Sequence, residues 1–425
     1  MNDHDALLRA IVENPAEDTP RLVFADWLDE NADTFPTPAV VRQRAAFIRD
    51  DIAMSQRDEF DPPRLRWELI EKPQRETEAW VKETLPNLPE GYDFISEPRF
   101  RRGFLSGVIL DSKYRRALPE PPVDQSPIAC LRFFACSLLG IELLRRVGWR
   151  SRIMALEFAR GGRTSLTDFH SLFALDNLAC LERLAFLEHT IDRRELDRLV
   201  TSAMFSRLVA VTITYTPVGN AFVESFNRLG TPIALRELQL RGCRIAPSAV
   251  AQLLVTPAAK NLKSLSFGGD RIGTPEKFHS LSRVSTPPLI RSLDMSNDTL
   301  NEGGLELFLT SPLVPGLQRL ILSDCGLNRT RASLIADGMF DSLRVLDLSC
   351  NPIGNDSAVA IANSPHFAGL RVLELSHSQV GDEGIEAILD SPLAENLVLL
   401  DLRGSPASAE MKEVLKAKMG DRVRV

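Results

Sequence analysis

The residues that could perform catalysis or hold a metal ion are scattered along this chain of 425 residues. Its 6 histidines and 6 cysteines include no histidine pair at the spacing of a helical metal site and no C-x-x-C pair. The sequence also contains no phosphate-binding glycine loop, no H-E-x-x-H and no G-x-S-x-G. We therefore expect no catalytic residue, no metal and no cofactor.

Polar side chains that could bind a partner recur at fixed places in a repeating sequence pattern. The candidate binding residues are Tyr215, Gln239, Arg241, Asp294, Asn297, Asp324, Asp347, Glu374, His377, Asp401 and Arg403. The C-terminal half of this set is acidic, and unpaired acids in a row repel each other unless a basic partner offsets them. Alternatively, Asp and Ser stand at these places only because the face is solvated.

The pattern that carries these residues is L-x-x-L-x-L. Copies begin at Leu181, Leu208, Leu235, Leu262, Ile290, Leu317, Leu343, Leu370 and Leu397, with a weaker copy at Ile153, and successive starts are 26–28 residues apart. The second and third apolar positions point to one face of a short strand, and the residues beside them point to the other. A small or polar residue follows each strand, such as Cys243, Cys325 or Asn351. We expect its side chain to bond buried backbone groups where the chain turns inward.

The second half of each repeat predicts a helix that stops at a recurring Ser-Pro or Thr-Pro. In GDEGIEAILDSP, for example, Ile385, Ile388 and Leu389 are spaced i, i+3, i+4. One strand and one helix cannot bury their own apolar face, whereas stacked copies can. The predicted fold is therefore an α/β solenoid, with a curved parallel sheet inside and helices on the convex side.

Residues 150–425 resemble the leucine-rich-repeat family, most closely its ribonuclease-inhibitor-type class with helical convex sides. The chain departs from the family pattern at the turn after the strand, where Asn stands only at Asn351. The resemblance implies that the concave face of the sheet recognises other proteins.

The first 56 residues follow a different pattern and predict a small unit of three helices. Phe24, Trp27 and Leu28, for example, form one apolar stripe. The segments ALLRAIVENPAEDTPRLVFADWLDENAD and RQRAAFIRDDIAM closely resemble the bacterial repeat-companion domain, which typically precedes leucine-rich or other repeats. This resemblance implies an accessory or adaptor protein of bacterial origin, without an activity that could be transferred. We interpret the charged residues as caps and ion pairs between the helices: Arg21, Asp26, Asp29, Arg44, Arg49 and Asp50.

Between these regions, residues 57–103 contain Trp67, Trp80 and several prolines, and they predict a helical and irregular connector. The solenoid is expected over 104–425, with a capping strand at 104–110 and a C-terminal cap helix at about 408–419. Within it, the proline-rich segment 118–127 predicts a loop, and the apolar segment 128–147 predicts a helix.

The net charge of -7 argues against nucleic acids and anionic membranes as partners. The N-terminus has no signal-peptide pattern and no apolar run reaches roughly 18 residues, so we expect a cytoplasmic protein with reduced cysteines. The sequence therefore predicts a non-catalytic adaptor or scaffold that binds a protein partner with a basic patch. Two alternatives stay open. One is a purely structural role with the N-terminal helices as a cap, and the other is an enzyme site within 57–150.

Overall fold

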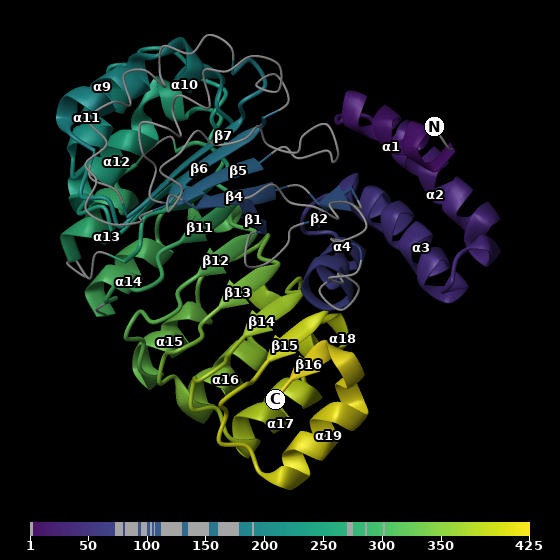
Figure 1. The fold of residues 1–425 in the computed structure, drawn as a ribbon. Coiled ribbons are helices and arrows are strands. Elements are labelled where there is room, and N and C mark those ends of the chain that lie inside the picture. Colours follow the sequence, from purple (N-terminus) through teal and green to yellow (C-terminus); the bar gives the residue numbers. More distant parts are fainter. Residues whose placement is uncertain are drawn as a thin grey trace. The chain divides into compact units, whose positions relative to one another are not determined.

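The computed structural model describes residues 3–72, 80, 92–94, 100–102, 104–105, 107–111, 130–134, 153–159, 178–188, 191–269, 275–284, 287–300 and 302–425. The chain divides into two compact units, Met1–His189 and Thr190–Val425 (Figure 1). No helix in the described part of the chain has both the length and the apolar character to cross a bilayer.

The first unit begins with three helices, where the sequence predicts them. They are α1 (Asp3–Glu13), α2 (Thr19–Asn31) and α3 (Pro38–Ser55), with a short helix η1 (Ala32–Thr34) between the last two. Their apolar stripes meet in a core that contains Ile11, Phe24, Leu28 and Ile48. Because α2 and α3 each bury a stripe that neither could bury alone, the three helices stabilise one another.

Ion pairs tie α3 to α2 in the way the sequence predicts. The guanidinium of Arg49 donates to the carboxylates of Asp26, at 2.8 Å, and Asp29, at 2.6 Å. Arg21 and Arg44 are instead buried, and their guanidinium carbons lie 5.7 and 5.0 Å from the ring centre of Phe104. The signature charges of this segment therefore hold the helices together and cover an aromatic ring.

A short helix α4 (Pro62–Arg66) and a π-helical turn η2 (Trp67–Glu71) follow α3. They are joined to α3 through Asp51, which is buried. Its carboxylate accepts from Trp67 Nε1 at 3.2 Å and pairs with Lys72 Nζ at 2.9 Å. The start of the predicted connector is thus fixed to the N-terminal helices by polar contacts.

The sheet of the first unit has the order β1-β4-β5-β6-β7. These strands are β1 (Tyr92–Phe94), β4 (Gly107–Asp111), β5 (Cys130–Phe134), β6 (Ala155–Ala159) and β7 (Arg183–Leu187), and a separate hairpin pairs β2 (Phe100–Arg101) with β3 (Phe104–Leu105). β1 runs antiparallel to β4, and the other neighbours are parallel.

The helix predicted over 128–147 is wrong at its start, because Cys130–Phe134 forms strand β5. Its register pairs Leu131 with Leu156 and Phe133 with Phe158. Ile128, Leu131 and Phe133 in fact follow the L-x-x-L-x-L pattern, which a short apolar run alone does not separate from a buried helix. The remainder of that prediction, and the loop predicted at 118–127, lie outside the described residues.

The second unit contains the regular part of the solenoid. Its strands follow one another in chain order and run parallel: β8 (Ala210–Thr214), β9 (Glu237–Arg241), β10 (Ser264–Ser266), β11 (Ser292–Asp294), β12 (Arg319–Ile321), β13 (Val345–Asp347), β14 (Val372–Glu374), β15 (Leu399–Asp401) and β16 (Val423–Arg424). The repeated leucines fill the interior, and Leu346 and Leu348 are both fully buried. The leucines therefore form one continuous core between coils.

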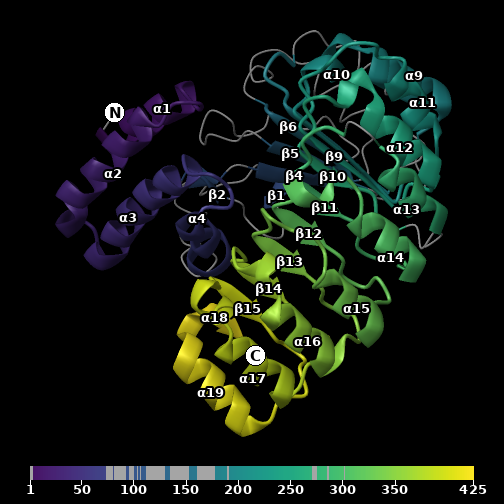
Figure 2. The same ribbon diagram turned by 180° about the vertical axis from the view of Figure 1, so that it is seen from behind.

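The helices of this unit cover one side of the sheet, as Figures 1 and 2 show from opposite directions. They are α9 (Arg193–Thr201), α10 (Ala203–Arg207), α11 (Ala221–Asn227), α12 (Pro247–Val255), α13 (Pro275–Ser282), α14 (Glu302–Leu309), α15 (Arg329–Ile335), α16 (Gly354–Asn363), α17 (Asp382–Asp390), α18 (Leu393–Asn396) and α19 (Ala409–Met419), with short helices η4 (Pro257–Ala259), η5 (Val314–Gly316), η6 (Pro365–Phe367) and η7 (Gly420–Arg422). Helices α12, α14, α16 and α17 end just before a Thr-Pro or Ser-Pro pair, as the sequence predicts. The predicted α/β solenoid fold is confirmed.

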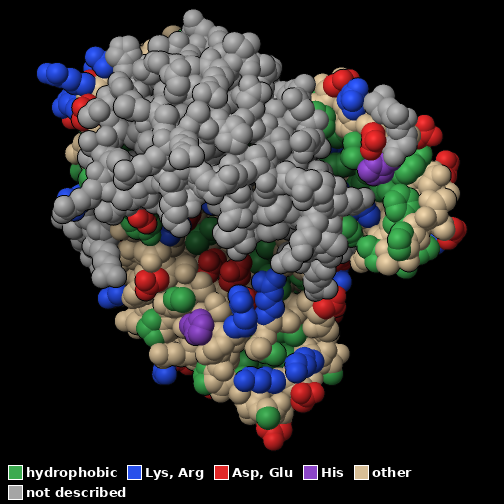
Figure 3. Space-filling view, viewed as in Figure 1, with side chains coloured by type: hydrophobic (Ala, Val, Ile, Leu, Met, Phe, Trp, Pro, Cys, Tyr) green, Lys and Arg blue, Asp and Glu red, His purple; other side chains and the backbone are tan. Residues whose placement is uncertain are grey.

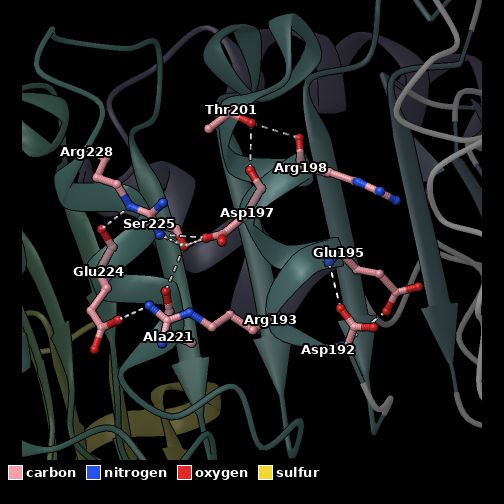
Figure 4. Close-up of polar contacts among 10 residues, drawn as sticks. All are labelled: Asp192, Arg193, Glu195, Asp197, Arg198, Thr201, Ala221, Glu224, Ser225 and Arg228. Atoms are coloured by element: carbon pink, nitrogen blue, oxygen red, sulfur yellow. Dashed lines mark hydrogen bonds and ion pairs between the residues drawn. The ribbon is translucent and has the colours of Figure 1, made fainter.

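Polar contacts join successive helices on the convex side, and Figure 4 shows those between α9 and α11. The carboxylate of Asp197 accepts from the hydroxyl of Ser225 and from Arg228 Nη2, the latter at 2.8 Å. These contacts, with the Ser225 hydroxyl as the largest cause, hold the pKa of Asp197 below its ordinary value. Arg193 and Glu224 add an ion pair of 2.5 Å.

In several coils the polar residue after the strand bonds the backbone of the preceding coil, as the sequence predicts. Cys243 Sγ donates to the carbonyl of Ile213 at 3.1 Å, and Ser378 Oγ donates to that of Leu348 at 3.2 Å. Asn351 forms more of these backbone bonds than Cys243 or Ser378. Its Oδ1 accepts from two backbone N–H groups, and its Nδ2 donates to three carbonyls, including that of Leu322 at 2.8 Å. This side chain is fully buried and joins two coils.

We predict that Asn351→Ala destabilises the protein by about 3–5 kcal/mol, because it leaves several buried backbone groups without partners. The matched control is Asn363→Ala. The Asn363 side chain is exposed and donates only to Val359 O, four residues back on its own helix. Urea unfolding followed by circular dichroism measures both free energies of unfolding. Equal losses for the two variants would contradict the role assigned to Asn351.

Candidate functional site

The candidate binding residues lie in columns that run across the strands of the second unit. The strand register places Asp294, Ile321, Asp347, Glu374 and Asp401 side by side on consecutive strands. Thr212, Gln239 and Ser266 extend this central column in the other direction. Neighbouring strands lie about 4.8 Å apart, so charges in this column are close enough to interact strongly.

At Asp294, a neighbouring arginine offsets the negative charge. Arg241 Nη1 lies 3.7 Å from the Asp294 carboxylate, and Arg241 Nη2 donates to Ser296 Oγ at 2.8 Å. Ser296 in turn donates to Asp294 through its backbone N–H, at 2.9 Å, and its hydroxyl, at 2.7 Å. Arg241 reaches across the intervening coil, where Gly268 has no side chain and where a Cβ would lie 2.0 Å from Ser296 O. The sequence therefore predicts these residues correctly as neighbours on the face, and the structure shows that they satisfy one another.

At the other end of the column, Asp401 is also paired with cations. Its carboxylate accepts from Arg403 Nη2 at 2.6 Å and from the backbone N–H of Arg403 at 3.1 Å. Arg424 Nη1, from the last strand β16, lies 3.9 Å away. Asp401 is 1% exposed, so a partner could not reach this carboxylate directly.

Between these two ends lie Asp347 and Glu374, the two acids of this column that form no ion pair with a described residue. Asp347 accepts from the backbone N–H of Ser349 at 2.8 Å and from its hydroxyl at 2.5 Å. Glu374 has no hydrogen bond or ion pair among the described residues. In Figure 3, acidic side chains lie beside basic ones over the C-terminal strands of this unit.

The pKa values of both carboxyls are raised, mainly because the two groups are partly buried. Burial raises the pKa of Glu374 above its ordinary value, and the negative charges of Asp347 and Asp401 raise it further. The positive charges of Arg424 and Arg403 offset only part of this rise in pKa. Burial also raises the pKa of Asp347, although its bonds from Ser349 act in the opposite direction. Negative charge on the face is thus concentrated at one adjacent pair, which we call the Asp347–Glu374 pair.

The remaining candidates occupy a sharp turn that follows the strand in their coils. Tyr215, Asn297, Asp324 and His377 have positive φ angles of 50°, 61°, 51° and 54°. Gly242, Gly269 and Gly404 hold the same turn in other coils. This backbone conformation favours Gly and Asn-like residues, so it accounts for most of the residue types in this column without a ligand. Tyr215 is the exception, because tyrosine is not a residue type that a positive φ angle favours. It is 57% exposed, and its ring lies so close to Gly242 that a Cβ there would be 2.6 Å from it.

Two arginines of the face are missing from the sequence-based candidates. Arg424 closes the central column of the second unit, and Arg132 in the first unit pairs with Glu157 at 2.5 Å. Arg132 would have been found by extending the repeat pattern to Ile128. Arg424 lies on a two-residue strand after the cap helix, where no copy of the pattern exists.

A candidate location for an enzyme site is a hollow of about 240 Å³ in the first unit, which is lined by Asp51, Trp67, Lys72 and Arg102 among others. Its charged groups pair with each other or with near neighbours, since Lys72 binds Asp51 and Arg102 lies 3.3 Å from Asp18. These pairs explain the cluster as structural. Within the described residues, no group of His, Cys, Asp or Glu is arranged to hold a metal ion. Burial raises the pKa of the Cys325 thiol to about 12, which disfavours the nucleophilic thiolate.

Comparison with known proteins agrees with the repeat. A family model described as Leucine Rich repeat matches residues 342–362 and 370–389. No curated protein sequence matches the chain. Among solved structures, the chain is similar to one in the crystal structure of the Rad7 and Elc1 complex in yeast, with 16% identity, a TM-score of 0.49, and coverage of 70% of this chain and 74% of that one. It is also similar to an internalin from Listeria monocytogenes, with 14% identity, a TM-score of 0.37, and coverage of 75% and 86%. The chain thus carries leucine-rich repeats.

We predict that Glu374→Gln raises the stability at neutral pH by on the order of 0.5–1 kcal/mol, the range for like charges on adjacent strands. A raised pKa means that the folded state holds the proton more tightly than the unfolded one. Stability therefore falls as pH rises from the unfolded pKa through the folded pKa. The gain should disappear at pH values below the ordinary pKa of glutamate.

The control for this prediction is Glu386→Gln, on helix α17 of the same unit, whose carboxyl is exposed. Thermal unfolding of the wild type and both variants between pH 3 and pH 8 measures the effect. A Glu374→Gln gain that is the same at all pH values would show that charge on Glu374 is not its cause.

Proposed function

We propose that this chain is a non-catalytic protein-binding module whose concave sheet face receives a basic side chain of a protein partner at the Asp347–Glu374 pair. The observation that carries the proposal is that two adjacent carboxyls form no ion pair, while Asp294 and Asp401, near the two ends of their column, each form one or more. A lysine or arginine of a partner would offset both charges and lower both pKa values. Ile321 lies beside Asp347 in the column and offers an apolar contact next to the charges.

The concave face suits this function because its residues sit on rigid strands. Strands β13 and β14, which carry the pair, are each hydrogen-bonded to a neighbouring strand on both sides, so little conformational entropy is lost on binding. Arg403 and Arg241 near the two ends of the acidic pair would repel a uniformly basic surface. The proposed ligand is accordingly a segment with one or two cations in an otherwise neutral or mixed sequence.

We further propose that residues 1–56 form a companion domain whose role toward the repeats is that of a cap. The support lies in Phe104, which is 1% exposed and contacts the ring of Phe24 at a centroid distance of 5.8 Å. Removing the helices would expose this ring and its neighbours.

We predict that the double variant Asp347→Asn with Glu374→Gln loses affinity for basic peptides by at least about tenfold. Peptides would be selected from a random display library with the wild-type protein as bait, and their affinities measured by fluorescence anisotropy. Affinity for the wild type should rise with pH as the two carboxyls ionise, at pH values above the ordinary pKa values of Asp and Glu, and then level off.

The matched control is Asp337→Asn with Glu386→Gln, which makes the same change of net charge at exposed positions away from the sheet. It should retain wild-type affinity. A selection that yields no peptide with Lys or Arg, or Lys- or Arg-containing peptides that bind the double variant as tightly as the wild type, would exclude the Asp347–Glu374 pair as the binding site.

A further inference from the structure

A second surface of the solenoid lies where the chain enters the strands, at the opposite end of each strand from the turn that holds Tyr215. It is a groove of about 400 Å³ formed by the residues just before β8, β9, β10 and β11. Its lining includes Val209, Arg236, Lys260, Asn261, Lys263 and Leu289. We call it the entry groove.

The charge of the entry groove is positive and uncompensated. Arg236, Lys260 and Lys263 are exposed, and their side chains make no hydrogen bond or ion pair in the described part of the chain. No carboxylate is among the residues that line the groove. Three cations this close repel one another, so an anionic ligand would stabilise them.

Arginines that occupy the repeat position of Arg236 in later coils have a structural role. Arg344 donates to the carbonyl of Gly369 at 2.8 Å, and Arg371 donates to the carbonyl and the side chain of Asn396 at 3.0 and 3.1 Å. Each of these bonds ties one coil to the next. Arg236 stands in the same place relative to Asn261, but Asn261 donates to Ile233 O and receives nothing from Arg236. Arg236 is therefore not explained by the structural role of its counterparts.

The entry groove also has an apolar part. Leu289 is 64% exposed, although it occupies the position at which the later coils place Gly369 and Asn396. Val209 is partly buried beside the cations. An exposed leucine next to three cations is a surface for a ligand that is both acidic and apolar.

The backbone of the groove cannot bind a ligand as an added strand. The N–H of Lys263 donates to Arg236 O at 2.8 Å, and that of Arg291 donates to Lys263 O at 2.7 Å. These groups belong to the ladder between coils. Recognition would accordingly depend on side chains, with carboxylates bound by the cations and an apolar side chain bound by Leu289.

We propose that the entry groove binds an acidic peptide segment of a partner protein in which carboxylates flank a large apolar side chain. Nucleic acid fits less well, because its affinity depends on many phosphate contacts and the groove has three cations beside an exposed leucine. This site is separate from the concave face, and its charge is of the opposite sign.

The test uses the full chain and a fluorescein-labelled peptide of repeated Glu-Glu-Leu units, measured by fluorescence anisotropy. Arg236→Gln with Lys263→Gln should weaken binding by about tenfold or more, and Leu289→Ser should weaken it several-fold. The control is Arg194→Gln with Arg198→Gln, which removes two exposed cations from helix α9 and should leave binding within about twofold of wild type. The Asp347→Asn, Glu374→Gln variant should also bind normally, which separates this proposal from the concave-face proposal.

Peptides of repeated Glu-Glu-Ser and Lys-Lys-Leu units, and a single-stranded oligonucleotide, complete the experiment. Binding should weaken for Glu-Glu-Ser and fall as salt is raised. The Lys-Lys-Leu peptide should not bind the Asp347→Asn, Glu374→Gln variant, in which the proposed site for basic peptides is removed and the entry groove is intact. The proposal is overturned if the wild type does not bind the Glu-Glu-Leu peptide, if the Arg236 and Lys263 variant binds it normally, or if the oligonucleotide binds more tightly than the peptide through the same two cations. Circular dichroism spectra and unfolding midpoints that match the wild type establish that each variant is folded.

Discussion

Every coil of this chain depends on its neighbours to bury what it cannot bury itself. Leu346 and Leu348 are fully enclosed only because the coils before and after β13 cover them. Backbone groups at the inward turn after the strand depend on a neighbouring coil in the same way, because side chains of the next coil bond them. Asn351 bonds Leu322 of the preceding coil, and Ser378 bonds Leu348. The spacing between coils is therefore set by both the leucine side chains and these bonds. The columns of side chains on the concave face of the sheet follow from that spacing.

This dependence brings like charges together on the face. Since strands lie about 4.8 Å apart, an acid placed at one repeat position faces the acid of the next coil whatever its own solvation favours. The chain offsets this at Asp294 with Arg241 and at Asp401 with Arg403 and Arg424. At the Asp347–Glu374 pair no ion pair forms, and burial and neighbouring acids raise both pKa values although Arg403 and Arg424 offset part of the rise at Glu374. The energetic cost of that pair is local, and the surrounding coils hold it in place.

The sequence predicts the columns but not the balance of charge within them. Repeat spacing is enough to place Asp347 beside Glu374, because the strand register follows directly from the leucines. The pairing of Arg241 with Asp294 depends on a side chain that crosses Gly268, and the spacing of residues along the chain does not show how far a side chain extends across the strands.

The residues of the turn show a different limit of the sequence prediction. Asn297, Asp324 and His377 read as binding residues because they are polar and periodic, yet a positive φ angle accounts for residues of that kind. In β5, a short apolar run was compatible with either helix or strand, and only pairing with β4 and β6 distinguishes them.

A repeating structure also gives each residue a set of internal controls, since the same position can be compared from coil to coil. Asp294, Asp347 and Asp401 each accept the backbone N–H two residues on, whereas Glu374 at the equivalent place has no such bond among the described residues. Arg344 and Arg371 each donate to the next coil, whereas Arg236 has no such bond there. Where a position keeps its residue type but not its structural contact, the fold no longer explains the residue. Both proposed sites contain such a position, one acidic on the concave face and one basic at the entry to the strands. Because stability in a solenoid is divided among coils, a local departure of this kind costs little elsewhere, which is how one repeat architecture can present two surfaces of opposite charge.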